Sequence, residues 1–330
     1  MKTSFRKYGR LKGQDLCEIT LTNDVGMEVK LLNYGATLES LTLAGVNMVL
    51  TLPKSEDYHQ ERNYLGGTIG RICGRIAKGE WKHGNEVTHL PLNEGENHVH
   101  GGLGIDTDVW NFQLQADETS ARAVFTIVDY AGHNGFPGNL KVKVTYRLDS
   151  QNNLDYKIEA LSDQMTIFNP ANHTYFTLGK RGADLMMKVA ADYYLPVDGA
   201  GIPTDGMHPV AGTPFDFRKS RIIGDALAEE DEQLKLRNGF DHPFILNGEK
   251  IAAKLESHHF GLEFTTDAPA VVIYTGNHFD HSGICRDFGQ YDAVTLEAQY
   301  PPVGDHNLQA ITLLAGEKFE RNCRYHFYQK

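Results

Sequence analysis

Regular alternation of apolar and polar residues is the feature of this sequence that most constrains its fold. Val142, Val144, Tyr146 and Leu148 alternate with Lys, Thr and Arg residues. Because successive side chains of a β-strand point to opposite faces, this pattern predicts a strand with one buried face. The alternation resumes over 154–160 after a polar stretch, so residues 141–160 predict an antiparallel hairpin with a loop of about five residues.

Similar short segments recur along the chain. Residues 80–90 predict a second hairpin, with a tight turn at Gly84 and Asn85. Further strands are expected at 27–34, 37–43, 121–130, 185–191, 261–266, 270–275 and 293–299. Only residues 221–237 carry a helical pattern, and their acidic centre favours a solvated surface helix or an irregular acidic loop. The pattern therefore predicts an all-β protein, a large antiparallel β-sandwich or barrel, formed by residues 1–330 as a single domain.

Composition excludes several classes of partner. The chain has 330 residues and a formal charge of −11, which would repel a nucleic-acid backbone or an anionic lipid surface. The N-terminus lacks the apolar run of a signal peptide, and no segment approaches the roughly 18 apolar residues that span a bilayer. The four cysteines form no CxxC pair, so we expect reduced thiols rather than disulfides or a zinc site. We expect a cytoplasmic protein with neither nucleic acid nor membrane as partner.

The stretch NHVHGG, residues 97–102, could belong to a metal site, a ligand site or the polar end of a strand. On a strand, His98 and His100 would share a face and could hold one metal ion. The first carboxylate after them is Asp106, so the nearby acidic ligand is missing and we expect no metal site. The following Gly101 and Gly102 would let the backbone pass close to a ligand or to another part of the chain.

Two other positions carry groups suited to proton transfer. Glu297 lies in the middle of the strand expected at 293–299, where Glu is rare, and is either part of a solvated face or a general base on a rigid element. His173 precedes Tyr175 on what would be the same face of a strand, and is either a hydrogen-bonded core histidine or an acid–base group. The residues alone leave both alternatives open.

Two further charged positions could bind a ligand. Asp241 precedes His242 and Pro243 and is expected to be a carboxylate in a loop. In GRICGRI, residues 70–76, either Arg71 or Arg75 could donate a planar pair of hydrogen bonds to oxygen atoms.

Several stretches together resemble the aldose 1-epimerase family, the galactose mutarotases, and in particular its bacterial cytoplasmic members. The likeness covers nearly the whole chain and follows the family's order. It is carried by LLNYGATLESL (31–41), GRICGRI (70–76), NHVHGG (97–102), GFPGNL (135–140), FNPANHTYFTL (168–178), YLPVDGAGIPTDG (194–206), VAGTPFDFR (210–218), GFDHPF (239–244), YTGNHFD (274–280) and TLEAQYPP (295–302).

The resemblance implies a fold and an activity. The fold would be a galactose-mutarotase-like antiparallel β-sandwich, or supersandwich, with few short helices. The activity would be that of an isomerase that interconverts the α and β anomers of free aldohexoses such as glucose and galactose. It implies no metal, nucleotide or other cofactor, and a small aldose sugar as the partner. The chain would be a monomer or a homodimer.

The resemblance also implies roles for residues at matching positions. Glu297 would be the general base that takes the proton from the C1 hydroxyl, and His173 the general acid that protonates the ring oxygen. Arg75, His100 and Asp241 would bind sugar oxygens. Asn97 and Tyr175 would be secondary substrate contacts.

Two alternatives stay open. A non-catalytic carbohydrate-binding or sensor module on the same fold would need Arg75, His100 and Asp241 but neither His173 nor Glu297. An epimerase of oligosaccharides or phosphorylated sugars is the other alternative, and phosphate would call for a basic cluster that the motifs lack.

Overall fold

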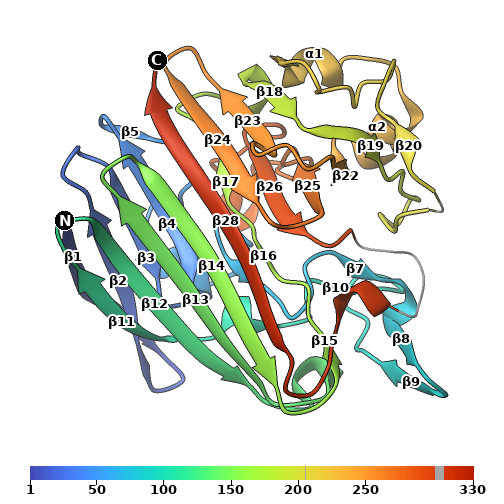
Figure 1. The fold of residues 1–330 in the computed structure, drawn as a ribbon, viewed down its shortest axis with the longest axis horizontal. Coiled ribbons are helices and arrows are strands. Elements are labelled where there is room, and N and C mark those ends of the chain that lie inside the picture. Colours follow the sequence, from blue (N-terminus) through green and yellow to red (C-terminus); the bar gives the residue numbers. More distant parts are fainter. Residues whose placement is uncertain (205, 302–307) are drawn as a thin grey trace.

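The computed structural model describes residues 1–204, 206–301 and 308–330, and three antiparallel sheets hold most of the strands (Figure 1). The nine-stranded sheet has the order β11 (Asn111–Ala116), β12 (Ser120–Asp129), β13 (Leu140–Asp149), β14 (Asn153–Ser162), β28 (Lys318–Gln329), β24 (Phe260–Thr266), β23 (Ala253–Glu256), β18 (Met186–Val189) and β21 (Arg221–Ile222). The six-stranded sheet has the order β17 (Tyr175–Phe176), β26 (Val294–Gln299), β25 (Ala270–Tyr274), β22 (Asp241–Leu246), β19 (Ala191–Tyr194) and β20 (His208–Pro209). The five-stranded sheet runs in sequence order through β1 (Lys2–Leu11), β2 (Gln14–Thr22), β3 (Glu28–Leu32), β4 (Thr37–Leu43) and β5 (Val46–Asn47).

Smaller elements connect these sheets. Two-stranded pairs are formed by β7 (Arg75–Ile76) with β10 (His98–Val99), β6 (Thr68–Ile69) with β16 (Ala171–Asn172), β8 (Glu80–His83) with β9 (Glu86–His89), and β15 (Thr166–Ile167) with β27 (Thr312–Leu313). The α-helices of the described residues are α1 (Ile223–Leu227) and α2 (Glu232–Arg237). Short 3₁₀ turns lie at Ser55–His59, Ala77–Gly79, Ile105–Thr107, His133–Gly135, Gly182–Asp184, Gly283–Cys285 and Gln309–Ile311.

The hairpin expected at 141–160 forms as β13 and β14, and its buried residues alternate along both strands as the sequence predicts. Its loop is shorter than expected, because the strands end at Asp149 and begin at Asn153. The Asp149 carboxylate accepts hydrogen bonds from the backbone N–H groups of Gln151 and Asn153, and Asn152 takes the left-handed conformation with φ 59°. An Asx turn of this kind closes a hairpin with few residues.

The main core lies between the nine-stranded sheet and the other two large sheets. One apolar cluster joins buried residues of all three, for example Leu31 of β3, Val144 of β13 and Ile273 of β25. In Figure 1 the nine-stranded sheet crosses the whole molecule, with strands of the other two sheets packed behind it. This arrangement confirms the predicted all-β antiparallel sandwich with few short helices.

The helical pattern over 221–237 does not form one helix. Residues 221–222 belong to β21, and two short helices are separated by residues 228–231. The break falls at the acidic centre, where the Asp231 carboxylate accepts hydrogen bonds from the N–H groups of Gln233 and Leu234 and so begins α2. An aspartate favours this N-cap position over the interior of a helix. Among the described residues, no helix is long and apolar enough to cross a membrane.

Candidate active site

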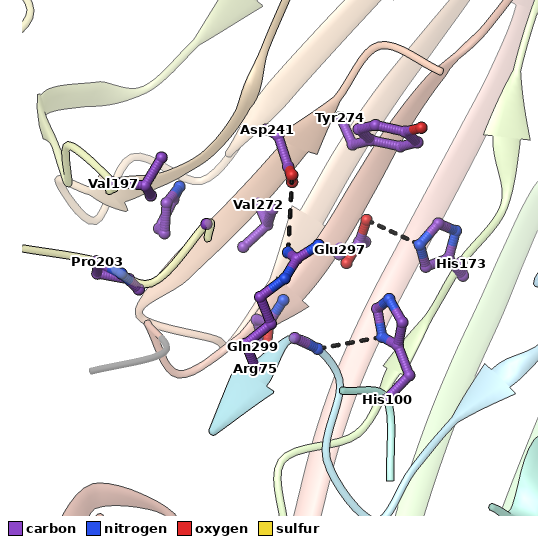
Figure 2. A pocket seen from close by; sticks show the side chains of 13 residues that line it. Arg75, His100, His173, Val197, Pro203, Asp241, Val272, Tyr274, Glu297 and Gln299 are labelled. Atoms are coloured by element: carbon purple, nitrogen blue, oxygen red, sulfur yellow. Dashed lines mark hydrogen bonds and ion pairs between the residues drawn. The ribbon is translucent and has the colours of Figure 1, made fainter. Parts of the chain in front are cut away.

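One face of the six-stranded sheet forms the floor of a polar pocket (Figure 2). Alternate residues of three neighbouring strands point into it, namely Asp241 and Pro243 of β22, Val272 and Tyr274 of β25, and Glu297 and Gln299 of β26. The walls come from other segments and consist of Gly74, Arg75, His100, His173, Val197, Gly201 and Pro203. The pocket encloses about 540 Å³, including space open to solvent.

Glu297 is buried at the centre of β26, with a side-chain exposure of 5%. The Thr295 hydroxyl donates a hydrogen bond to its Oε1 over 2.8 Å, and the Cys73 thiol donates one to its Oε2 over 3.2 Å. Burial is the main cause that raises the pKa of Cys73 well above its usual range, so this group is a protonated thiol and a donor. The structure thus places Glu297 on a rigid strand inside a pocket and not on a solvated face of the sheet.

His173 is a second titratable neighbour of Glu297, after Cys73. Its Nε2 lies 3.3 Å from Glu297 Oε1, and its side chain is 5% exposed. It lies between β16 and β17 rather than on a strand, and its ring packs beside the rings of Tyr64, His100 and Tyr175. His173 and Glu297 are therefore adjacent groups in contact.

His100 lies outside the strand expected for NHVHGG, because β10 ends at Val99 and His100 has a φ of 50°. Its Nδ1 accepts a hydrogen bond from the Gly74 N–H over 3.2 Å. Burial, followed by the charges of His173 and Arg75, lowers the pKa of His100 well below its ordinary value. A neutral ring that accepts at Nδ1 carries its proton on Nε2, so His100 can offer a donor to a ligand.

The two arginines of GRICGRI have different surroundings. Arg75 lines the pocket and makes a two-point ion pair with Glu94, with Nε–Oε2 and Nη2–Oε1 distances of 2.5 and 2.8 Å. Arg71 points away from it and is buried against Asp129, with 2.5 Å between Nε and Oδ2. Of the two candidates, Arg75 is thus the one placed to contact a ligand.

Asp241 is not a loop residue, as the sequence suggested, but the first residue of β22, where it pairs with Tyr274 of β25. The proline at position 243 is compatible with a strand because proline favours an extended preceding residue. Burial alone would raise the pKa of Asp241, but the guanidinium groups of Arg75 and Arg237 outweigh it and hold the pKa below its ordinary value. Arg237 Nη2 lies 2.6 Å from Asp241 Oδ2, so the carboxylate is ionised and fixed in position.

Three other residues of the sequence motifs lie beside the pocket lining rather than in it. Asn97 accepts a hydrogen bond from the Lys78 N–H, and Tyr175 is buried with its ring 5.0 Å from that of His173. His98 is fully buried, bonded through Nδ1 to the Pro91 carbonyl. His98 and His100 contact different neighbours, and among the described residues no group of three or more His, Cys, Asp or Glu side chains could hold a metal ion.

Gly101 and Gly102 lie close to other segments of the chain. A Cβ at Gly101 would lie 2.5 Å from the Gly70 carbonyl oxygen, and one at Gly102 would lie 2.5 Å from the Asn134 side chain. Both glycines also have positive φ values, 68° and 70°. They let the backbone after His100 pass the segment that carries Arg75.

Sequence reasoning missed several pocket residues: Tyr274, Val272, Gln299, Val197 and Pro203. A signal existed for Gln299, because alternation places it on the same strand face as Glu297. Tyr274 stands in the motif YTGNHFD but carries no charge that would single it out. The sequence predicts only a free thiol at Cys73, because its contact with Glu297 joins positions 224 residues apart.

Comparison with known proteins identifies the family of the chain. A family model described as aldose 1-epimerase matches residues 18–326. The crystal structure of a galactose 1-epimerase from Lactobacillus acidophilus NCFM is 57% identical, with a TM-score of 0.98 over 99% of each chain. The aldose 1-epimerase of Escherichia coli K12 is 33% identical over 96% of both chains, and the maltose epimerase of Levilactobacillus brevis is 30% identical over 98% of both. With its sandwich fold, its pocket and these matches, the chain belongs to the aldose 1-epimerase family of isomerases.

Proposed function

We propose that this enzyme interconverts the α and β anomers of free aldohexoses such as D-glucose and D-galactose, with Glu297 as general base and His173 as general acid. The observation that carries the proposal is the 3.3 Å contact between His173 Nε2 and Glu297 Oε1 on the floor of a polar pocket. Both oxygens that exchange protons in a cyclic hemiacetal are bonded to the same carbon, C1. Two adjacent proton-transfer groups therefore suit this reaction.

The proposed reaction begins with the sugar bound by its C1 end at this pair. Glu297 takes the proton of the C1 hydroxyl while protonated His173 gives a proton to the ring oxygen. The bond between C1 and the ring oxygen breaks, which leaves an open-chain aldehyde, a protonated Glu297 and a neutral His173. Rotation about the C1–C2 bond exposes the other face of the carbonyl. His173 then takes the proton from the C5 hydroxyl as it attacks C1, and Glu297 returns its proton to the C1 oxygen.

The other polar groups support this sequence of steps. Positioned acid and base groups typically contribute about 10²–10⁴ each to the rate. Arg75 would stabilise negative charge that develops on oxygen during ring opening, and neutral His100 would donate from Nε2 to a second sugar oxygen. Asp241, fixed by Arg237, would accept hydrogen bonds from sugar hydroxyl groups. Tyr175 would pack against the His173 ring, and Asn97 would be a secondary contact to the substrate.

We further propose that residues 1–330 act as one catalytic domain, as a monomer or homodimer in the cytoplasm. The family match from residue 18 to 326 supports a single domain. The four free cysteines fit a reducing compartment. A carbohydrate-binding or sensor module is less well supported, because such a module has no need of a buried His173–Glu297 pair. Maltose is a second candidate substrate, because one relative is named maltose epimerase. The reducing glucose of maltose has a free C1 hydroxyl.

Polarimetry on freshly dissolved α-D-glucose, α-D-galactose and maltose tests this function. We expect the wild-type enzyme to accelerate mutarotation of at least one of these sugars far above buffer. Glu297→Gln and His173→Asn should each lose at least about 10²-fold in kcat, because each removes one proton-transfer group of nearly the same size. A chelator should leave the rate unchanged.

Thermal unfolding of each variant shows whether its fold is intact. A wild-type rate no faster than buffer with all three sugars would contradict the enzyme. Full activity in either variant would contradict the assigned roles. Loss of activity with chelator would instead call for a metal ion.

A further inference from the structure

Gln299 is a buried polar residue of the pocket. Within the described residues, its amide oxygen is hydrogen-bonded but its amide nitrogen is not. Its side chain lies on the pocket face of β26, two residues beyond Glu297, and the residue is fully buried. Its Oε1 accepts a hydrogen bond from Asn169 Nδ2 over 3.3 Å, whereas its Nε2 is buried and has no hydrogen-bond partner among the residues that the structure describes. A buried amide donor without a partner costs about 1–3 kcal/mol, so its presence calls for an explanation.

The orientation of the Gln299 amide follows from its neighbours. Asn169 Oδ1 accepts from the Tyr300 backbone N–H at 3.0 Å and from Arg321 Nη1 at 3.4 Å, both of which can only donate. Asn169 Nδ2 donates to the Tyr300 carbonyl over 3.0 Å, which can only accept. The Asn169 amide therefore has one allowed orientation. The atom of Gln299 that faces Asn169 Nδ2 must be the oxygen, and the NH₂ group is left for the pocket.

The position of Gln299 also limits what it can contact. Residues two apart on a strand are separated by roughly 6.7 Å, a spacing comparable with the width of a pyranose ring. Thr295, Glu297 and Gln299 follow one another along this face, and Thr295 bonds Glu297 from the side away from Gln299. Figure 2 shows Gln299 near Arg75, with Glu297 between it and Tyr274. A sugar with C1 at Glu297 would thus bring an oxygen other than O1 toward Gln299.

We propose that Gln299 Nε2 donates a hydrogen bond to a sugar hydroxyl group other than the C1 hydroxyl, and that this contact selects for aldoses that carry an oxygen at that position. The proposal rests on the proposed function, since it takes the sugar to be bound with C1 at Glu297. The free enzyme holds an unpartnered donor, and the correct substrate supplies the acceptor. A sugar without that hydroxyl group leaves the donor buried and unpaired, which disfavours it.

The test uses Gln299→Met, which keeps the length of the side chain and removes the donor, and the series D-galactose, 2-deoxy-, 3-deoxy-, 4-deoxy- and 6-deoxy-D-galactose. Loss of one hydrogen bond to a sugar should lower kcat/KM for D-galactose about 10- to 100-fold, mostly through a higher KM. With the wild-type enzyme, one deoxy sugar of the series should have a kcat/KM lower than that of D-galactose by a similar factor. With Gln299→Met, that same deoxy sugar should show almost no additional loss, because the contact is already absent.

A second variant and a control keep the test decisive. Asn169→Asp preserves the acceptor for Tyr300 and Arg321 but removes the donor that orients Gln299, so it should weaken discrimination at the same sugar position. Gln164→Met, at an exposed glutamine outside the pocket, should behave as the wild type. The inference would be overturned if Gln299→Met left kcat/KM unchanged, or lowered it equally for every sugar in the series. A wild type inactive on all aldoses would overturn the proposed function instead, so the two failures are distinguishable.

Discussion

In the described part of the chain, three side chains make polar contacts with the Glu297 carboxylate, and Thr295 is the one that lies close to it in sequence. His173 and Cys73 reach it from distant segments. Glu297 could be proposed from the sequence because Glu is rare in the middle of a strand. Both Glu297 and His173 could be proposed because they match motifs of the family. Cys73 could not, since a lone cysteine gives no pattern and its contact exists only after folding.

Cys73 should influence the rate without touching the sugar. Cys73→Ala removes a hydrogen bond to Glu297 Oε2, and we expect kcat to fall about 3- to 10-fold, a modest effect because a thiol is a weak donor. Cys73→Ser restores a donor and should recover most of the rate. Steady-state kinetics on D-galactose would measure both. An alanine variant with wild-type kcat, or a serine variant as slow as the alanine variant, would show that the contact with Glu297 does not support the rate.

Whole segments were predicted best where one pattern extends over many residues. The strands at 37–43 and 270–274 and the hairpin at 80–89 form close to their expected bounds, because each is a short run of strand-forming residues bounded by turn residues. The structure departs from the periodic pattern where a few residues decide the local conformation. Asp231 divides the helical pattern, and the positive φ of His100 ends the alternation in NHVHGG. Such local effects depend on contacts that a periodic pattern does not contain.

The segment of residues 70–76 depends on Arg71 for its attachment to the nine-stranded sheet. The Arg71 guanidinium binds the Asp129 carboxylate and carbonyl, the carbonyls of Pro137 and Gly138, and the Thr166 hydroxyl. This buried network fixes the segment that places Arg75 in the pocket lining and Cys73 against Glu297.

Arg71→Lys should lower the free energy of unfolding by about 3–5 kcal/mol, because a lysine cannot make the planar, multiple hydrogen bonds and leaves Asp129 buried with fewer partners. Chemical denaturation measures this change. The control is Arg324→Lys, at a partly exposed arginine paired with Asp155, where a loss of no more than about 1 kcal/mol is expected. Equal losses in the two variants would contradict the structural role of Arg71.

At the scale of the whole molecule, the sandwich brings together strands that are far apart in sequence. β22, β25 and β26 are neighbours in one sheet, and their register places Pro243, Val272 and Glu297 in one row. The sequence predicted the fold class from its alternation, and the family from its motifs. It could not supply the order of strands in the sheets, which depends on long-range pairing, and so it could not show that Gln299 shares the pocket with Asp241.

Several histidines are kept neutral by the fold, which makes stability depend on pH. Burial lowers the pKa of His242 to about 4, and burial also lowers the pKa of His98 and His100. Below about pH 6.5 the unfolded chain binds protons at these sites and the folded chain does not, so stability falls as the pH drops from 7 toward 5. Glu39 acts in the opposite direction, because burial raises its pKa to about 7.

Denaturation at pH 7 and at pH 5 should show a less stable wild type at the lower pH. His242→Asn removes one of these sites. The slope of its unfolding free energy against pH should therefore be smaller than that of the wild type by up to about 1.4 kcal/mol per pH unit below pH 6. His258→Asn, at an exposed histidine, is the matched control and should keep the wild-type slope. Identical slopes in the wild type and His242→Asn would mean that His242 is not held neutral by the fold.

The proposal that Glu297 and His173 open and close a sugar ring is tested most directly at anomeric equilibrium. Two-dimensional exchange NMR on D-galactose, with a catalytic amount of enzyme, detects transfer of magnetisation between the C1 protons of the α and β anomers. We predict exchange cross-peaks with the wild type, and only the buffer level with Glu297→Gln or His173→Asn at the same concentration. Wild-type exchange no faster than buffer, or undiminished exchange in both variants, would contradict the proposed chemistry.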